Sequence, residues 1–179
     1  MLKIVTVPHQ SLSKPTNPVN KIDDKIKKLV YEMEETLISQ SDPQGVGLAA
    51  NQVGISLSIF LMKKSPQAET KVFINPKILS SSGLVDDSSV KSRRKSPVKL
   101  EGCLSIPRVW GPVKRSPKVH LEFQDLTGKL ITKWFVGFEA VIVQHEVDHL
   151  QGVVFTRRSL EQKAPLYKEV GGKLKPFDV

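Results

Sequence analysis

Two histidines four residues apart give the clearest chemical signal in the sequence. Residues 144–150 read Gln-His-Glu-Val-Asp-His-Leu and contain the pattern H-E-x-x-H. If this stretch is helical, His145 and His149 lie one turn apart on one face, where both imidazoles can bind one metal ion. Glu146 then stands beside any water on that ion, in the position of a general base. The alternative is a core helix whose histidines are satisfied by hydrogen bonds alone.

The setting of the pattern favours the metal. The preceding residues 140–143 read Ala-Val-Ile-Val, and Val147 and Leu150 continue the apolar character. A helix that is apolar on nearly all sides is a buried one. Buried histidines beside a buried Glu–Asp pair need partners, and a metal ion supplies them.

A catalytic zinc-type site commonly has three protein ligands and an open position for water, so a third ligand is needed. The extended metalloprotease pattern H-E-x-x-H-x-x-G-x-x-H is excluded, because Phe155 occupies the third histidine position although Gly152 is in register. A thermolysin-like glutamate would have to be Glu161 or Glu169, in a segment broken by proline and glycine.

Cys103 is the most attractive third ligand. His9 and His120 are also available, but each lies in an ordinary strand-like context. A thiolate binds this class of metal well, and the neighbouring Gly102 lets the backbone come close. As the only cysteine, Cys103 has no partner for an internal disulfide, which fits a reducing cytoplasm.

Composition indicates an ordinary globular protein with a basic balance. The 179 residues are 39% hydrophobic and 25% charged, with a net charge of +9, which suits one domain spanning 1–179. The charge suggests a polyanionic neighbour such as RNA or a ribosome, or only good solubility. No apolar run approaches the length of a membrane span, and the start lacks a signal-peptide core. We therefore expect a cytoplasmic protein without a membrane partner.

The hydrophobic periodicity predicts a mixture of helices and strands. Apolar residues at three- and four-residue spacing predict a helix over 20–39, capped by Asn20. Strands are expected at 2–8, 57–62 and 72–74, the last stopped by Asn75-Pro76, and at 118–124 and 131–136 as an antiparallel pair. Residues 80–99 are polar and basic, and we expect a mobile loop. Residues 156–179 should be a short tail in which Ser159 caps one brief helix.

Three stretches together resemble the three motifs of peptide deformylases, in the same order and at similar spacing. They are 45–52 (Gly-Val-Gly-Leu-Ala-Ala-Asn-Gln), 101–105 (Glu-Gly-Cys-Leu-Ser) and 144–152 (Gln-His-Glu-Val-Asp-His-Leu-Gln-Gly). The resemblance implies an α+β fold, with antiparallel or mixed β-sheets packed around a central metal-binding H-E-x-x-H helix. It implies hydrolysis of the N-formyl group from the formyl-methionine of new polypeptides, which releases formate.

The resemblance also implies roles for individual residues. Cys103, His145 and His149 would bind one divalent metal ion, Glu146 would be the general base and acid, and Gln52 and the backbone N–H of Leu104 would meet the oxyanion. The residues expected to bind substrate are Val46, Gly47, Gly102, Phe138, Val141 and Ile142. For the last three, ordinary core packing is the alternative, and both readings can hold together.

The family favours iron(II) in the cell and zinc or nickel in a purified sample, although the donor set alone would also hold cobalt. Three departures from the family pattern stand out. The basic loop before Glu101 is long, Trp110 stands where many bacterial relatives carry a polar or basic residue, and the tail lacks the basic helix by which some members dock on the ribosome. The partners expected are N-formylmethionyl peptides, with the ribosome in doubt and no sequence-specific nucleic acid.

Two rival functions have other signatures. A metallopeptidase that cuts internal peptide bonds would digest casein without any formyl requirement. A non-enzymatic RNA- or ribosome-associated protein would bind RNA in a salt-sensitive manner and would release no formate.

Overall fold

The computed structural model describes residues 1–82 and 99–177. Its helices are α1 (Asp24–Ile38), α2 (Phe138–Leu150) and α3 (Phe155–Glu161), with 3-10 turns η1 (Gln10–Ser13) and η2 (Ala50–Val53). Its strands are β1 (Gly47–Ala49), β2 (Ile59–Met62), β3 (Lys71–Ser82), β4 (Leu100–Cys103), β5 (Ile106–Pro112), β6 (Lys118–Gln124), β7 (Leu130–Val136), β8 (Leu166–Val170) and β9 (Lys173–Phe177). Among these helices, none is both long and apolar enough to cross a membrane.

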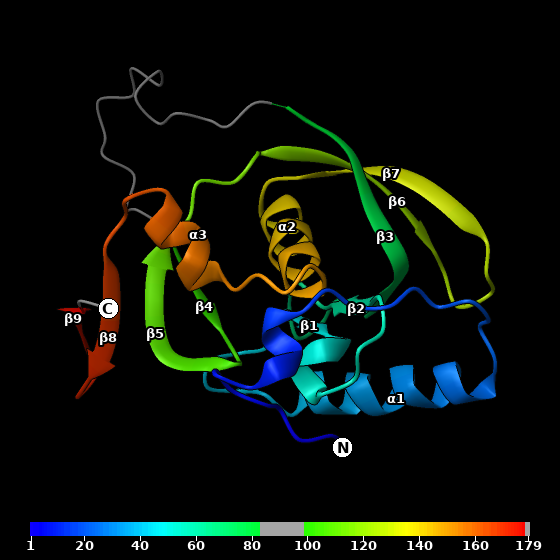
Figure 1. Cartoon of the computed structure of the whole chain (residues 1–179), viewed down its shortest axis with the longest axis horizontal. Coiled ribbons are helices and arrows are strands. Elements are labelled where there is room, and N and C mark those ends of the chain that lie inside the picture. The colour runs from blue at the N-terminus through cyan, green and yellow to red at the C-terminus, as the bar shows by residue number, and fades with distance from the viewer. Residues whose placement is uncertain (83–98, 178–179) are drawn as a thin grey trace.

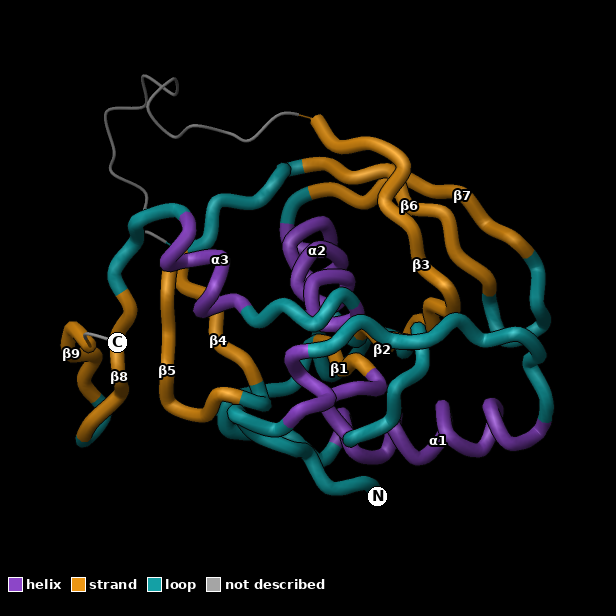
Figure 2. Tube along the Cα trace, in the orientation of Figure 1, coloured by secondary structure: helices purple, strands orange, loops and turns teal. Residues whose placement is uncertain are grey.

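Two antiparallel sheets flank α2 (Figure 1). One has the strand order β1-β2-β3-β6-β7 and the other the order β4-β5-β8-β9. In Figure 2 the strands β3, β6 and β7 lie on one side of α2, and β4 and β5 lie on the other. The expected α+β architecture around a central helix is confirmed.

The five-stranded sheet is covered by helices on both faces at its β1–β2 end. Alternate residues of β1 and β2 point to opposite faces, so Leu48 and Ile59 pack with the α1 side chains Met33 and Leu37. On the opposite face, a cluster of phenylalanines and small aliphatic residues packs against α2, and it contains Ala49, Phe60, Phe73, Phe123, Phe135, Ala140, Ile142, Val143 and Val147. This packing fixes the position of α2 and therefore of its histidines.

The predicted helix 20–39 exists but begins later than expected. α1 starts at Asp24, and Asp23 caps it by accepting hydrogen bonds from the N–H groups of Lys25 and Ile26, both at 3.1 Å. The prediction of Asn20 as the cap was wrong, because Asp23 supplies the acceptor nearer to the apolar-periodic segment.

Two strand predictions were wrong, one for a strand that does not form and one for the end of a strand. Residues 2–8 form no strand, because Val5 N–H donates to Gln52 O and Val7 N–H to Ser105 O, two partners in different segments. β3 does not stop at Asn75-Pro76 but continues to Ser82. Asn75 takes φ +51° at a register shift. Its side-chain oxygen accepts from the Val19 N–H, and its side-chain nitrogen donates to the Val19 carbonyl. This bulge accommodates the proline without ending the strand.

The corrected β3 shortens the expected loop. Residues 80–82 belong to the strand, and Lys99 leads directly into β4. Residues 83–98 lie outside the described residues, so the mobility expected there stays a prediction. The antiparallel pair was predicted correctly, with β6 over 118–124 and β7 over 130–136.

The C-terminal segment is more ordered than the predicted tail. Ser159 does not cap α3 but lies inside it, buried, with its hydroxyl donating to Pro112 O at 3.0 Å. After α3, β8 and β9 form a hairpin turned by Gly171 and Gly172, which both have positive φ (58° and 72°). That turn geometry requires residues without a side-chain penalty at φ > 0. Paired glycines of this kind are a sequence signal for a hairpin turn.

Candidate metal centre

α2 presents both histidines of the H-E-x-x-H pattern on one face. The rings of His145 and His149 have centroids 5.0 Å apart. The helix begins after Gly137, whose φ of +59° turns the chain from β7, and Gly152 follows its end with φ +72°. His149 is fully buried and His145 nearly so. The predicted helix and the predicted spatial pairing are both present.

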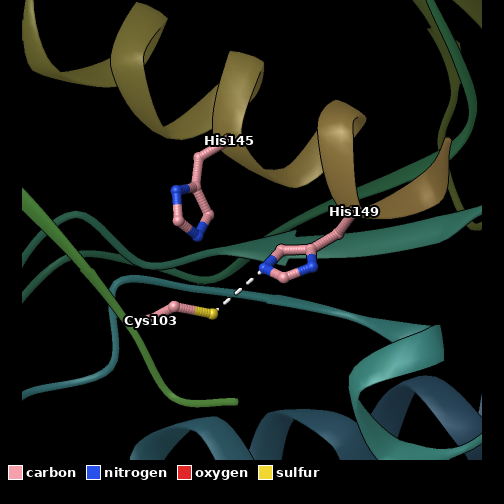
Figure 3. A group of neighbouring side chains, drawn as sticks. All are labelled: Cys103, His145 and His149. Carbon is pink, nitrogen blue, oxygen red and sulfur yellow. Dashed lines mark hydrogen bonds between the residues drawn. The ribbon is translucent and has the colours of Figure 1, made fainter. Parts of the chain in front are cut away.

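β4 brings Cys103 to the two histidines from the other sheet (Figure 3). A register shift between Gly102 and Cys103 bends the strand at this point. The Cys103 sulfur lies 3.2 Å from Nε2 of His149, and the donor atoms of Cys103, His145 and His149 all lie within 4.8 Å of one another. Since Zn–N and Zn–S bonds of about 2.0–2.3 Å place ligand atoms roughly 3–4 Å apart, this group is nearly at coordination spacing.

An unsatisfied polar atom beside the three donors indicates that the site is built for a ligand. Within the described residues, Oε2 of Glu146 is buried there without a hydrogen-bond partner. Buried polar groups without partners are rare in folded proteins. One soft thiolate and two imidazoles suit zinc, iron(II), nickel or cobalt, so the donor set fits a transition metal.

Glu101 orients the first histidine. Its Oε2 lies 2.9 Å from Nδ1 of His145, and Arg115 donates to both of its oxygens at 2.8 and 3.0 Å. Burial disfavours the charged carboxylate, but the bonds from His145 and Arg115 outweigh it and lower the pKa of Glu101 to about 2. Burial lowers the pKa of His145, but its bonds to Cys103 and Glu101 outweigh this and raise the pKa well above its usual value in the metal-free protein. An ionised Glu101 holds one proton on Nδ1, so Nε2 is the nitrogen that would give up its proton to a metal ion.

The second histidine is kept neutral by its surroundings. Burial, together with the positive charges of His145 and Arg115, lowers the pKa of His149 well below its usual range. Asn51 donates to the backbone carbonyl of His149 at 2.5 Å and to Ser11 O at 3.1 Å, which ties η2 to the end of α2. The neutral imidazole is the form that binds metal.

Gln52 extends from η2 with its side-chain amide nitrogen directed at the site. Its Oε1 accepts from the Ala49 N–H at 2.8 Å, so its Nε2 points to the Cys103 sulfur at 3.4 Å and to Ser105 Oγ at 3.3 Å. The Ser105 N–H also points to the sulfur, at 3.4 Å. Gln52 is thus buried with its amide nitrogen as the donor, directed at the two residues on either side of Leu104.

Glu146 lies against β1. A Cβ added at Gly47 would stand 2.3 Å from Oε1 of Glu146, so only a glycine lets the strand pass this carboxylate so closely. Burial, opposed by the charges of His145 and Arg115, raises the pKa of Glu146 to about 7. The carboxyl group is therefore poised to exchange a proton near neutral pH.

The predicted substrate residues fall into two groups. Val46, Gly47, Gly102 and Val141 lie at or beside the cluster or its helix and are at most half-exposed, whereas Phe138 is exposed at the start of α2. Ile142 is buried in the core against the five-stranded sheet, where the packing alternative holds.

Trp110 covers the site from outside. Its ring lies over Gly102, where a Cβ would meet it at 2.6 Å, and its Nε1 is 3.4 Å from Glu169 of β8. The C-terminal hairpin thereby holds the residue that departs from the family pattern. This connection could not be read from the sequence, since the hairpin itself was not predicted.

Several charged residues behind the histidines were also missed. Arg115, Asp148 and Arg158 form an ion-pair chain with Glu101, buried except at Arg158. The one available signal was the spacing of Asp148, three residues after His145 and hence on the same helical face.

Comparison with known proteins decides the family. The model of the family described as "Polypeptide deformylase" matches residues 1–164. The chain belongs to the polypeptide deformylase family. A peptide deformylase of Afipia carboxidovorans is 38% identical over 156 residues, which cover 86% of this chain and 83% of that protein. One of Desulfotalea psychrophila is 34% identical over 173 residues and covers 94% of each chain.

Solved deformylase structures share the fold. The crystal structure of the peptide deformylase from Thermotoga maritima superposes with a TM-score of 0.74 at 34% identity, over 88% of this chain and 97% of that one. The enzyme from Synechococcus elongatus, in complex with actinonin, gives 0.75 at 32% identity, over 90% and 87%. As a member of this metal-dependent family, the protein is a hydrolase that removes the N-formyl group from new polypeptides.

Proposed function

We propose that Cys103, His145 and His149 together bind one divalent metal ion and that Glu146 is the acid–base residue of deformylation. The convergence of the three donor atoms within 4.8 Å, beside the buried carboxylate of Glu146, carries this proposal. The ion would polarise the formyl oxygen and lower the pKa of a water molecule toward neutrality. We infer iron(II) in the cell, and zinc or nickel in a purified sample.

Glu146 is suited to move protons in both directions. Its buried carboxyl group, whose pKa is about 7 in the metal-free protein, would accept a proton from water and later donate it to the departing amine. Its unpartnered Oε2 is the atom we assign to the water. The amine is otherwise a poor leaving group, so the second transfer is needed for release of the peptide.

Gln52 and the backbone N–H of Leu104 meet the negative charge that develops on the formyl oxygen. The Ala49 N–H fixes the Gln52 amide, so this donor is oriented before the substrate arrives. Loss of one preorganised donor of this kind raises a barrier by about 3 kcal/mol.

The substrate peptide would bind as an added strand. β1 is an edge strand of its sheet, paired with β2 on one side, which leaves its other edge for an extended peptide. Val46 and Gly47 would contact the peptide backbone, with Gly102 opposite. Phe138 and Val141 would line the methionine pocket with Ile142 packed behind them.

The cytoplasm suits this assignment, because its reducing conditions keep the Cys103 thiol available for metal. The described C-terminal residues form the β8–β9 hairpin and not the basic helix by which some family members are expected to dock on the ribosome. Any docking on the ribosome would therefore use another surface, for which the basic segment 83–98 is our candidate.

The test is formate release from formyl-Met-Ala-Ser by anaerobically prepared protein, with and without a chelator. We expect formate release that the chelator abolishes and added metal restores. Casein cleavage without a formyl requirement would favour a metallopeptidase. Salt-sensitive RNA binding without formate release from metal-replete protein would favour the non-enzymatic reading.

A further inference from the structure

Four charged side chains connect His145 to the outer side of α3. Glu101 contacts His145, and Arg115 contacts Glu101. Arg115 also donates to Asp148 Oδ2 at 2.5 Å, and Arg158 of α3 donates to Asp148 Oδ2 at 3.1 Å and Oδ1 at 2.7 Å. The charges alternate along this chain, so each member is held by neighbours of opposite sign.

Arg115 divides its donors between two carboxylates. Its Nε and one terminal nitrogen serve Glu101, while the other terminal nitrogen serves Asp148. Asp148 accepts from Arg158 at both oxygens and from Arg115 at Oδ2 alone. Without Arg158, Asp148 would keep a buried oxygen that lacks its charged donor and would draw Arg115 toward itself. Glu101 would then lose part of the contact that fixes it.

Arg158 is the accessible end of the chain. The side chains of Arg115 and Asp148 are 8% and 9% exposed, whereas that of Arg158 is 34% exposed. A cavity of about 290 Å³ adjoins them, lined by all three residues and by Gln144, Val147 and Gln151. Its position on the ion-pair side of α2 makes Arg158 reachable by a small cation from solvent.

We propose that Arg158 is a positioning residue for deformylation. By holding Asp148, it keeps Arg115 on Glu101, and Glu101 keeps Nε2 of His145 directed to the metal. The inference rests on the proposed role of His145 as a ligand. A rival reading is that Arg158 only fastens α3 to α2, in which case its loss lowers stability and leaves metal binding unchanged.

The experiment compares Arg158→Ala with Arg157→Ala in the cobalt(II)-loaded protein. Arg157 is the matched control, because it pairs with Glu161 at 3.0 Å and not with Asp148. The readouts are the cobalt absorption spectrum, the rate of metal loss to a competing chelator and turnover of formyl-Met-Ala-Ser. We expect Arg158→Ala to lose metal about 10-fold faster, at the low end of the range for residues that orient metal-bound histidines. Arg157→Ala should match the wild type.

Two rescues separate positioning from plain stability. Arg158→Lys and millimolar guanidinium added to Arg158→Ala should both restore the spectrum in part, since each returns a cation to Asp148. A lowered melting temperature with an unchanged spectrum and unchanged metal loss would overturn the proposal.

His145→Ala distinguishes failure of this inference from failure of the proposed function. If His145→Ala loses metal while Arg158→Ala behaves like Arg157→Ala, the positioning role alone is wrong. If His145→Ala binds cobalt with the wild-type spectrum, the ligand assignment is wrong, and the positioning role falls with it.

Discussion

At the scale of single residues, burial determines the chemistry of Glu146. The carboxyl group is 3% exposed, touches the edge strand at Gly47 and has a pKa raised to about 7. A buried acid with this pKa suits proton transfer at neutral pH. The same burial means that ionising Glu146 lowers the stability of the folded state.

Replacing Glu146 by Gln should abolish turnover and spare the metal. We expect kcat to fall by about 10²–10⁴-fold, the usual contribution of a general acid–base residue. Metal content by elemental analysis should equal that of the wild type, because Glu146 is not among the three clustered donors. Retention of wild-type kcat would refute the acid–base role.

The same substitution should change how stability depends on pH in the metal-free protein. Below pH 4.5 Glu146 is protonated in both states. As pH rises to about 7, the unfolded chain releases this proton and the folded protein retains it, so folding loses stability, by about 3 kcal/mol in total. The Glu146→Gln variant should not show this loss of stability, because glutamine does not ionise.

Urea unfolding at pH 5 and pH 8 measures the effect. The stability advantage of the variant over wild type should be greater at pH 8. An equal difference at the two values would mean that the folded pKa of Glu146 is not raised.

The H-E-x-x-H spacing predicted that His145, His149 and Glu146 lie together, and thiolate chemistry made Cys103 the most attractive third donor, which the motif resemblance also implied. They did not predict the chain from Glu101 to Arg158. Its members come from β4, the β5–β6 connection, α2 and α3, and only the folded arrangement brings them together.

At the scale of elements, hydrophobic periodicity predicted a helix or strand correctly where one face of the element is buried and the other is exposed. Three- and four-residue spacing located α1, and alternation of polar and apolar residues located β6, with β7 expected as its antiparallel partner. The patterns failed at Asn75, where side-chain bonds to Val19 sustain a bulge, and at the β8–β9 hairpin. In β9 the residues are exposed along the strand, so no alternation of burial accompanies it.

The hairpin should be a structural part of the site and not a loose tail. Leu166 at the start of β8 is 3% exposed and packs with Cys103, Ile106 and Phe155. Leu166→Ala should lower the free energy of unfolding by about 2–5 kcal/mol, the range for a leucine removed from a core.

Leu174→Ala is the matched control, because it changes the same residue type in the same hairpin at 46% exposure. It should alter stability by no more than about 0.5 kcal/mol. Denaturant unfolding of both variants makes the comparison, and equal effects would show that Leu166 is not packed as described.

At the scale of the whole molecule, the metal centre joins separately packed parts. Cys103 belongs to the core cluster of the second sheet, whereas α2 is packed on the five-stranded sheet. A bound ion therefore links the two sheets through α2 and should stabilise the entire fold, since it binds the native state and not the dispersed ligands of the unfolded chain.

Metal removal should consequently lower the melting temperature reversibly. At free metal a thousandfold above Kd, the bound ion contributes about 4 kcal/mol. Calorimetry with and without chelator should show a loss of this order in wild type and a smaller one in Cys103→Ser, which holds the ion more weakly. A melting temperature indifferent to chelator and metal would contradict a link between the sheets.

X-ray absorption spectroscopy of the zinc-loaded protein identifies the atoms bound to the ion. We expect one sulfur at about 2.3 Å and two imidazole nitrogens at about 2.0–2.1 Å from the ion, with the sulfur absent in Cys103→Ser. A first shell without sulfur in the wild type, or one unchanged by Cys103→Ser, would contradict the assignment of Cys103 as a ligand.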